Sequence, residues 1–279
     1  MTITGATCVA GVIGWPVHHS LSPALHNAAF AAAGTDWVYA AFEVAPGCAG
    51  EALHAMRTLG LAGLSVTMPH KLAVADAVDV LAPAAAALRS VNTVVHLPDG
   101  RLEGHSTDGA GFVASLAEAN VAVAGRSVVV FGAGAAARSV IDAVARAGAA
   151  TVTVVNRTTE RGEQAAALAG PVGRAGGFDD IAAADIVVNA TSLGMDDEST
   201  PFDPKLLAAH QIVADLVYHP LETALLVAAR AVGAITVDGL GMLVHQAALQ
   251  QELWLGVRPD TAVMRAAALR ELDSRRRIA

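Results

Sequence analysis

The chain has 279 residues, of which 54% are hydrophobic, so it can fill one large hydrophobic core or two modest ones, and we favour two domains. Only 16% of the residues are charged, and the formal net charge is −8. This composition offers no basic field to hold a nucleic-acid backbone, so nucleic acid is not expected as a partner.

The first 35 residues contain no Asp, Glu, Lys or Arg, which is a feature of signal and membrane segments. However, the segment has no basic start, and glycine, proline and polar residues interrupt it before it could span a bilayer. No other stretch of the sequence is long and apolar enough to span a bilayer, so we expect no membrane association. Cys8 and Cys48 lack metal or redox spacing, and the histidines form no ligand pattern. We therefore expect a cytoplasmic protein without a metal site or a disulfide framework.

Short runs rich in Val and Ile alternate with longer Ala/Leu segments, which is typical of βα units on a mainly parallel sheet. The predicted strands are 8–13, 37–43, 63–67, 93–96, 127–131, 151–156, 186–189, 212–215 and 235–238. The predicted helices are 23–33, 51–59, 70–80, 81–88, 109–119, 135–147, 160–168, 222–231 and 242–255.

The character of the sequence changes near Asp108, after which a strand, a glycine-rich turn, a helix and a second strand follow in dinucleotide-binding order. We therefore predict an α/β protein with an N-terminal α/β substrate-binding and catalytic domain at 1–107. A Rossmann-type, doubly wound nucleotide-binding domain follows at 108–241, and the C-terminal helices, 242–279, return to the first domain.

Two serines precede the first predicted helix, in the segment His19-Ser20-Leu-Ser22-Pro23. Ser22 suits the N-cap position and Pro23 the first helical position, so a simple helix start explains part of the pattern. It does not explain Ser20. Because residues two apart in an extended segment point the same way, both hydroxyls could face one anion near the positive end of the helix. The segment thus suits a substrate carboxylate.

A second strand-to-helix junction reads Ser65-Val-Thr67-Met-Pro69-His-Lys71, with Pro69 near the first helical position. Lys71 then falls in the first helical turn, where the helix dipole disfavours a cation. A lysine at that place is a poor choice for stability alone. This indicates a functional lysine, with an exposed surface side chain as the alternative.

The strand at 127–131 leads directly into a G-x-G-x-x-A motif formed by Gly132, Ala133, Gly134, Ala135, Ala136 and Ala137. Gly132 would permit the tight turn, Gly134 would let the backbone approach a pyrophosphate, and Ala137 is small enough for close helix–sheet packing. The following helix offers its N-terminal N–H groups to phosphate. The motif predicts a dinucleotide site, and an Ala/Gly-rich turn is the alternative.

The end of the next strand distinguishes the two nicotinamide cofactors, because NAD sites usually carry an acidic residue there to bind the ribose hydroxyl. Here Asn156, Arg157 and Thr158 follow the strand, and Arg161 comes soon after. Arg157 can bind a 2′-phosphate, Thr158 can add a hydroxyl, and Arg138 on the preceding helix could close the clamp. Any one of these arginines could be a solvated side chain, but together they favour NADP(H).

Several short motifs follow one another in a characteristic order over nearly the whole chain. They are Gly14-Trp-Pro-Val-His-His-Ser20-Leu-Ser22-Pro-Ala-Leu-His26-Asn27, Val66-Thr67-Met-Pro-His-Lys71, Val91-Asn92-Thr93, Ser106-Thr107-Asp108-Gly109, Gly132-Ala-Gly134-Ala-Ala, Asn156-Arg157-Thr158, Asn189-Ala-Thr191-Ser192-Leu-Gly194-Met195, Asp215-Leu-Val-Tyr218 and Gly239-Leu-Gly-Met242-Leu-Val-His-Gln246. With these motifs the chain resembles the shikimate dehydrogenase family.

The resemblance implies roles for individual residues. Ser20 and Ser22 would hold the substrate carboxylate, and Lys71 and Asp108 would be the catalytic pair. The residues that would line the substrate ring are Thr67, Lys71, Asn92, Asp108, Tyr218 and Gln246. The adenosine phosphate would bind at Asn156, Arg157 and Thr158, and the residues near the cofactor would include Thr191, Met195, Leu216 and Gly239. The family fold has an α/β substrate domain, a Rossmann domain and a cleft that can close.

Two positions depart from the family pattern. The family commonly reads Asn-Thr-Asp where this chain has Ser106-Thr107-Asp108, which puts a local hydrogen bond in doubt. It commonly has a second glycine where this chain has Ala135, which slightly crowds the phosphate loop. For the segment Asn189–Met195, an ordinary polar loop after a buried strand is the alternative.

The resemblance implies reversible reduction of 3-dehydroshikimate by NADPH to shikimate, a step of chorismate and aromatic amino acid biosynthesis. Lys71 would exchange the proton, and Asp108 would orient both Lys71 and the substrate hydroxyl. Because a close Lys–Asp pair titrates as a unit, which of the two residues is formally the acid stays open. The alternatives are a quinate/shikimate or aminoshikimate-type dehydrogenase, some of which use NAD, and a non-catalytic NADPH-binding sensor. The expected partner is the small-molecule substrate, and the protein would be a monomer or a homodimer.

Overall fold

The computed structural model describes residues 2–195 and 197–278 and divides the chain into two compact units. Unit 1 comprises Met1–Thr107 and Gln246–Ala279, and unit 2 comprises Asp108–His245. The second boundary falls inside helix α9 (Gly239–Leu255), a few residues after the boundary at 241 that the sequence suggested.

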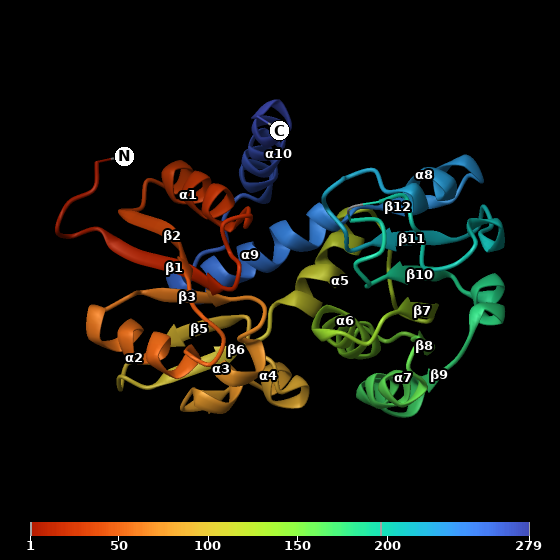
Figure 1. The fold of residues 1–279 in the computed structure, drawn as a ribbon, viewed down its shortest axis with the longest axis horizontal. Coiled ribbons are helices and arrows are strands. Elements are labelled where there is room, and N and C mark those ends of the chain that lie inside the picture. The colour runs from red at the N-terminus through yellow and green to blue at the C-terminus, as the bar shows by residue number, and fades with distance from the viewer. Residues whose placement is uncertain (1, 196, 279) are drawn as a thin grey trace. The chain divides into compact units, whose positions relative to one another are not determined.

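Unit 1 is built on a mixed six-stranded sheet with the order β2-β1-β3-β5-β6-β4 (Figure 1). Its strands are β1 (Cys8–Gly14), β2 (Trp37–Glu43), β3 (Gly63–Val66), β4 (Val80–Leu81), β5 (Thr93–His96) and β6 (Leu102–His105). β1 pairs in parallel with β2 and β3, whereas β5 runs antiparallel to β3 and β6. The helices of unit 1 are α1 (Ser22–Ala33), α2 (Ala49–Leu59), α3 (Lys71–Ala77), α4 (Pro83–Leu88) and α10 (Thr261–Ile278), together with the C-terminal part of α9.

Both faces of this sheet are covered, because successive residues of a strand point to opposite sides. Ile13 of β1 belongs to a core cluster with Leu53 of α2 and Val74 of α3. Its neighbour Val12 packs instead into a cluster with Phe30 of α1. All four residues of β3 are buried, as expected for a strand between two helical layers.

Unit 2 contains a six-stranded sheet with the order β12-β11-β10-β7-β8-β9, and every pair in it is parallel. Its strands are β7 (Ser127–Phe131), β8 (Thr151–Val155), β9 (Gly173–Ala175), β10 (Ile186–Asn189), β11 (Ile212–Asp215) and β12 (Ile235–Val237). β7, the first of these strands in the chain, lies in the middle between β8 and β10. The strand order reverses there, as in Rossmann domains, so the predicted α/β fold with a Rossmann-type unit is confirmed.

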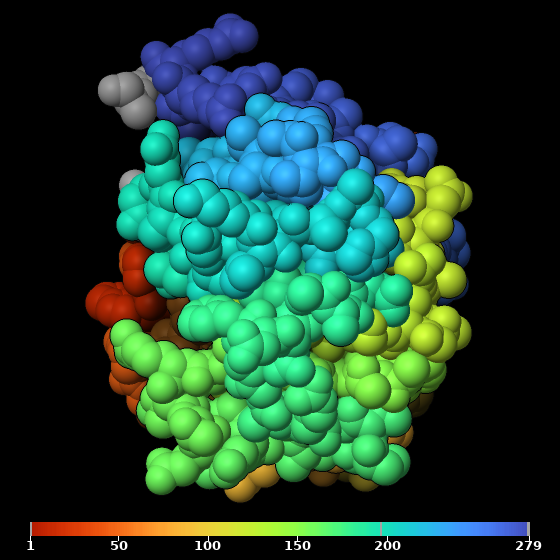
Figure 2. Space-filling view, turned by 90° about the vertical axis from the view of Figure 1, so that its right-hand side faces the viewer, coloured from red at the N-terminus to blue at the C-terminus, as the bar shows by residue number. Residues whose placement is uncertain are grey.

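The helices of unit 2 pack on both faces of the sheet. They are α5 (Asp108–Glu118), α6 (Ala135–Arg146), α7 (Thr159–Ala166), α8 (Ala224–Ala231) and the 3-10 helices η1 (Ala167–Val172), η2 (Phe178–Ala183) and η3 (Pro204–Leu206), together with the N-terminal part of α9. Val130 of β7 packs with Ile141 of α6, whereas Phe131 packs with Leu225 of α8. Figure 2 shows one face of unit 2, whose surface is formed largely by segments from α7 to α8, green to light blue.

Some elements differ from the sequence prediction. The helix predicted at 70–80 ends at Ala77, because Val78 is extended and Val80–Leu81 then pair with β6. The short strands β4, β6 and β9 were not predicted, since two to four residues give no clear apolar period. Helix α10 lies in the C-terminal segment that was expected to be helical, but its bounds were not predicted, because its arginine-rich sequence gives no clear apolar period. Across the described residues, no helix is long and apolar enough to cross a membrane.

Candidate functional site

The turn after β7 has the geometry of a phosphate-binding loop. Gly132 adopts φ 112°, and a Cβ built on it would lie 2.9 Å from the Ala190 carbonyl oxygen. A side chain there would be both strained and crowded. By contrast, Gly134 has φ −74° and a Cβ on it would point into open space, while Ala137 is fully buried against the sheet. The loop thus leaves its surface open at Gly134 and packs tightly at the other two positions.

Helix α6 starts directly after this turn, with Gly134 at its N-cap and no side-chain hydrogen bond capping it. The first N–H groups of a helix have no intrahelical carbonyl partner, so they can donate to an anion. Ala135 and Ala136 occupy this first turn, and Ala133 lies between the two glycines. Ala135 is exposed, so its methyl group is accommodated without disturbing the core.

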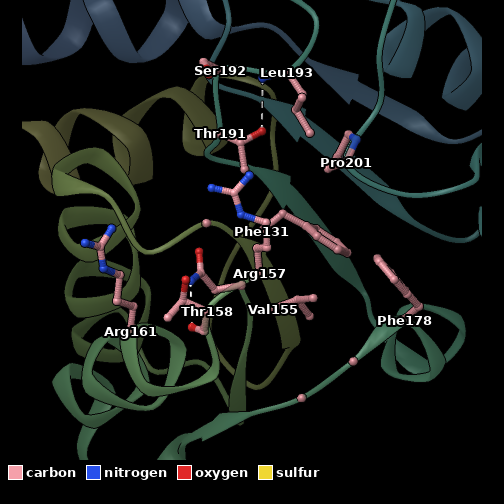
Figure 3. Close-up of a pocket in the computed structure, with 14 residues that line it drawn as sticks. Phe131, Val155, Arg157, Thr158, Arg161, Phe178, Thr191, Ser192, Leu193 and Pro201 are labelled. Carbon is pink, nitrogen blue, oxygen red and sulfur yellow. Dashed lines mark hydrogen bonds between the residues drawn. The ribbon is translucent and has the colours of Figure 1, made fainter.

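A pocket of about 730 Å³ lies at the C-terminal ends of β7, β8 and β10 within unit 2 (Figure 3). Its lining joins Gly132 to most of the predicted cofactor residues beyond β8: Asn156, Arg157, Thr158, Arg161 and, from the loop after β10, Thr191. Figure 3 shows Arg157 extending from the end of β8 in the direction of Thr191, with Arg161 on the other side of Thr158. The pocket therefore presents two guanidinium groups and contains no acidic side chain among its lining residues.

Several predicted cofactor residues do not line this pocket. They are Ala133, Gly134, Ala135, Ala136, Arg138, Met195, Leu216 and Gly239. Leu216 and Gly239 nevertheless lie together, because a Cβ on Gly239 would come within 2.4 Å of the Leu216 carbonyl oxygen. Arg138, in the first turn of α6, stays a predicted clamp residue.

One wall of the pocket was not predicted from the sequence. It is formed by Gly176, Gly177, Phe178 and Pro201, while Ser192 and Leu193 belong to the motif after β10 that the sequence analysis singled out. Phe178 is 53% exposed and stacks on Phe131 at a centroid distance of 6.2 Å and an interplanar angle of 17°. An exposed aromatic ring beside two glycines is a surface on which a flat base can stack. The signal was hidden because the preceding strand, β9, has only three residues.

The loop after β10 is fixed by a buried hydrogen-bond network. Asn189 Nδ2 donates to Asp215 Oδ1 at 2.9 Å, while Asn189 Oδ1 accepts from Thr191 N at 3.1 Å and from Thr191 Oγ1 at 2.7 Å. Thr223 Oγ1 donates to the other carboxyl oxygen of Asp215 at 2.7 Å. Burial raises the pKa of Asp215, and these donors oppose the rise. Asn189 and Asp215 thus hold Thr191 in place at the pocket.

In unit 1 the predicted substrate residues gather at one edge of the sheet. Ser20 and Ser22 follow β1, and Thr67 and Lys71 follow β3; because these strands are parallel, their C-terminal ends meet. Asn92 precedes β5, which is antiparallel to β3 and so begins at the same edge. Backbone hydrogen bonds hold the segments that carry these residues together. Thr67 N donates to the Ile13 carbonyl at 2.9 Å, Val66 N to Asn92 O at 2.8 Å and Val91 N to Lys71 O at 3.0 Å.

The predicted helix cap at Ser22 is wrong. The N-cap of α1 is Leu21, which already has helical angles, and Ser22 is the first residue of the helix. The hydroxyl of Ser20 takes the local bond instead, since its Oγ accepts from Ser22 N at 3.2 Å. Pro69 also lies outside its helix, before the N-cap residue His70, while Lys71 is the first residue of α3.

A buried polar network surrounds Asn92. Its Nδ2 donates to Thr107 Oγ1 at 2.9 Å, its Oδ1 accepts from Thr107 N at 2.9 Å, and its Nδ2 lies 3.5 Å from Gln246 Oε1. Next to it, the Ser106 hydroxyl is buried without a hydrogen-bond partner among the described residues, at the position where the sequence departs from the family. Asp108 begins α5 and Tyr218 follows β11, so these two predicted substrate residues belong to unit 2.

No group of three or more His, Cys, Asp or Glu side chains in the described part of the chain could hold a metal ion. The donor groups present fit a dinucleotide phosphate instead: an open glycine turn, an uncapped helix N-terminus and two arginines beside one pocket.

The fold and the pocket define the class, an α/β protein with a Rossmann-type unit. Three family models match the chain: the shikimate dehydrogenase substrate binding domain over 12–94, shikimate/quinate 5-dehydrogenase over 115–194 and the shikimate 5′-dehydrogenase C-terminal domain over 239–269. The shikimate dehydrogenase (NADP(+)) of Symbiobacterium thermophilum is 48% identical, with 98% of this chain and 97% of the relative aligned. The chain belongs to the shikimate dehydrogenase family, as its motifs predicted.

Solved structures agree over both units. A shikimate dehydrogenase crystallised with NADP⁺ superposes with a TM-score of 0.92 at 36% identity, covering 97% of this chain and 98% of that chain. Shikimate 5-dehydrogenase from Thermus thermophilus, crystallised with NADP(H) and shikimate, gives a TM-score of 0.89 at 36% identity and covers 95% of this chain and 99% of that chain.

Proposed function

We propose that this chain is an NADP-dependent shikimate dehydrogenase that reversibly reduces 3-dehydroshikimate to shikimate. The observation that carries the proposal is the unit 2 pocket, in which the Gly132 turn and the side chains of Arg157 and Arg161 line one cavity. A guanidinium group binds phosphate oxygens through charge-assisted hydrogen bonds, and a carboxylate in the same place would repel them. NADP carries that extra 2′-phosphate and NAD does not. The NADP-named relatives support the same choice.

The cofactor-binding residues in this proposal divide by the part of NADP(H) that they contact. Gly132, Gly134 and the first turn of α6 bind the pyrophosphate, and Asn156, Arg157, Thr158 and Arg161 bind the adenosine phosphate. The side chain of Asn156 is already ordered, because its Nδ2 donates to Thr158 O at 2.8 Å. Thr191, Met195, Leu216 and Gly239 lie near the remainder of the cofactor, and Phe178 stacks on its base.

The substrate-binding residues in this proposal come mainly from unit 1. Ser20 and Ser22 donate hydrogen bonds to the carboxylate. Thr67, Lys71, Asn92 and Gln246, with Asp108 and Tyr218 from unit 2, bind the hydroxylated ring. Asn92 and Gln246 are 3% and 8% exposed, so their amides are rigid and largely dehydrated, which strengthens each hydrogen bond that they make.

NADPH, when bound, supplies the hydride for the substrate carbonyl. The protein must then deliver one proton to the carbonyl oxygen, and we assign this to Lys71 with Asp108 as its partner. Lys71 is held firmly: its carbonyl accepts from Val91 N at 3.0 Å, and the ring of the preceding His70 donates to Val44 O at 2.7 Å. In the oxidation direction the same side chain accepts the hydroxyl proton.

On this proposal unit 1 is the substrate-binding and catalytic domain and unit 2 the NADP-binding domain, working in the cytoplasm as a monomer or a homodimer. Steady-state kinetics of the full chain with shikimate or quinate, each with NADP⁺ or NAD⁺, tests the function directly. We expect the highest kcat/KM with shikimate and NADP⁺. A higher value with quinate or with NAD⁺ would identify a quinate-type dehydrogenase, and no turnover with any pair would indicate a binding protein without catalysis.

A further inference from the structure

The C-terminal helix of unit 1 reaches the segment that carries Ser20. Arg275, near the end of α10, donates from Nη1 to the His19 carbonyl at 2.6 Å and from Nη2 to the Ser20 carbonyl at 3.3 Å. Its Nε donates to Glu271 Oε1 at 2.8 Å, one helical turn earlier. The guanidinium group is therefore itself oriented while it holds two consecutive backbone carbonyls.

These bonds complete the anchoring of Ser20. Its N–H donates to the Val17 carbonyl at 2.9 Å, its carbonyl accepts from Arg275, and its Oγ accepts from Ser22 N at 3.2 Å. A serine hydroxyl has one hydrogen to donate besides its lone pairs. The bond from Ser22 N uses Ser20 Oγ only as an acceptor, so this bond does not use the hydroxyl hydrogen. That hydrogen is the donor that a carboxylate requires.

Ser20 and Arg275 also share a cavity of about 390 Å³ in unit 1, which is lined by His18, Ser20, Pro23, Ala24, Asn27, Glu271 and Arg275. The side chain of Arg275 is 34% exposed, so its contact with the carbonyls is shielded only in part from water. The neighbouring residues Arg276 and Arg277 carry the same charge, are exposed and offer matched controls.

We propose that Arg275 is a positioning residue for the substrate carboxylate. It does not touch the substrate in this proposal; it fixes the backbone of residues 19 and 20 so that the Ser20 hydroxyl is ordered before the substrate arrives. Without it, part of the binding free energy would be spent on ordering the segment. The inference rests on the proposed function, in which Ser20 binds a carboxylate.

The test compares Arg275→Ala with Arg276→Ala and Arg277→Ala in the full chain, by steady-state kinetics with shikimate and NADP⁺. We expect Arg275→Ala to raise the KM for shikimate about ten-fold, as loss of charge-assisted hydrogen bonds would. Neither kcat nor the KM for NADP⁺ should change more than about two-fold, and Arg275→Lys, which keeps one donor group, should fall between wild type and Ala. A shikimate KM in Arg275→Ala equal to that of Arg276→Ala would overturn the proposal.

Two further arms separate the possible failures. Ser20→Ala tests the carboxylate site itself: if it raises the KM for shikimate and Arg275→Ala does not, only the positioning role is wrong. If the wild-type chain does not turn over shikimate, the proposed function fails and the positioning role fails with it. If Arg275→Ala does not fold, Arg275→Lys is compared with Arg276→Lys instead. A higher KM for shikimate in Arg275→Lys than in Arg276→Lys supports the proposal, and equal values overturn it.

Discussion

Gln250 Nε2 donates a 2.9 Å hydrogen bond to Oε1 of Gln246, one turn earlier on α9. The Oε1 of Gln250 in turn accepts from Ser65 Oγ at 2.7 Å, and Ser65 Oγ accepts from Tyr39 Oη at 2.7 Å. This buried chain of bonds sets the orientation of both amides. Gln246 Oε1 is an acceptor in this chain of bonds, which fixes the orientation of the amide that binds the substrate ring in the proposed site.

Replacing Gln250 with Met should therefore weaken substrate binding as well as stability. The change leaves Ser65 and Gln246 each without one buried partner, which costs about 1–3 kcal/mol of unfolding free energy. The KM for shikimate should rise while the KM for NADP⁺ stays constant. Gln251→Met is the matched control, because buried Gln251 bonds His26 and not Gln246. It should lose stability only, and an equal rise in shikimate KM for both variants would contradict the account.

The two glycines of the phosphate loop should respond differently to alanine. Gly132→Ala forces a side chain into φ 112° beside the Ala190 carbonyl, which costs about 1–3 kcal/mol of stability. Gly134→Ala adds a methyl group in open space at an allowed φ, so stability should change by less than about 1 kcal/mol. Both should weaken NADPH binding. Measuring unfolding free energy and NADPH affinity together checks this, and unchanged NADPH affinity in Gly134→Ala would show that the pyrophosphate lies elsewhere.

Arg157→Ser should change cofactor preference. Because only NADP⁺ carries the 2′-phosphate, loss of the guanidinium group should cost about 1.5–3 kcal/mol of NADP⁺ binding and leave NAD⁺ binding nearly unchanged. The KM values for both cofactors, measured at saturating shikimate, give the result. Arg230→Ala, an exposed arginine of α8 outside the pocket, serves as the control. Parallel changes for NADP⁺ and NAD⁺ would remove Arg157 from the phosphate site.

His26 should make the unfolding free energy depend on pH. It is fully buried, stacks on Tyr39 at a centroid distance of 4.2 Å, and burial lowers its pKa to about 3. The unfolded chain therefore binds a proton below about pH 6.5 that the folded protein does not, so this histidine lowers stability as pH falls from 6.5 toward 3. Between roughly pH 7 and pH 5 the loss should be about 2 kcal/mol.

The measurement is urea unfolding across this pH range for wild type and His26→Phe. The variant should lose about 2 kcal/mol less than wild type between the two ends of the range, whatever its absolute stability. If wild type and His26→Phe have equal slopes, His26 does not titrate differently on unfolding.

The sequence predicted the parts of the fold whose patterns are local and strong. The β7 strand, the Gly132 turn and the α6 helix could be recognised because apolar strand, glycines and helix follow one another without a gap. The Ser22 cap was misassigned because two serines compete for one position, and only the three-dimensional structure shows that the Ser20 hydroxyl takes the bond.

Contacts between distant segments were beyond the reach of sequence patterns. Phe178, which lines the pocket, follows a strand of only three residues. Arg275 and Ser20 are hydrogen-bonded although they lie 255 positions apart in the sequence. The bond between Ser65 and Gln250 likewise joins β3 to α9 and leaves no periodic trace in either segment. Such partners depend on how helices dock on a sheet, which composition and spacing do not specify.

The most direct test of the central claim is the turnover number for shikimate oxidation with NADP⁺ in wild type, Lys71→Ala, Asp108→Asn and the double variant. Wild type should turn over, and Lys71→Ala should be slower by about 10²–10⁴-fold with NADPH affinity unchanged, because a positioned proton-transfer group is lost. The double variant should be far less than multiplicatively worse than the singles. Near-normal turnover in Lys71→Ala would contradict the proton-transfer role, and multiplicative losses would show that Lys71 and Asp108 do not act as a pair.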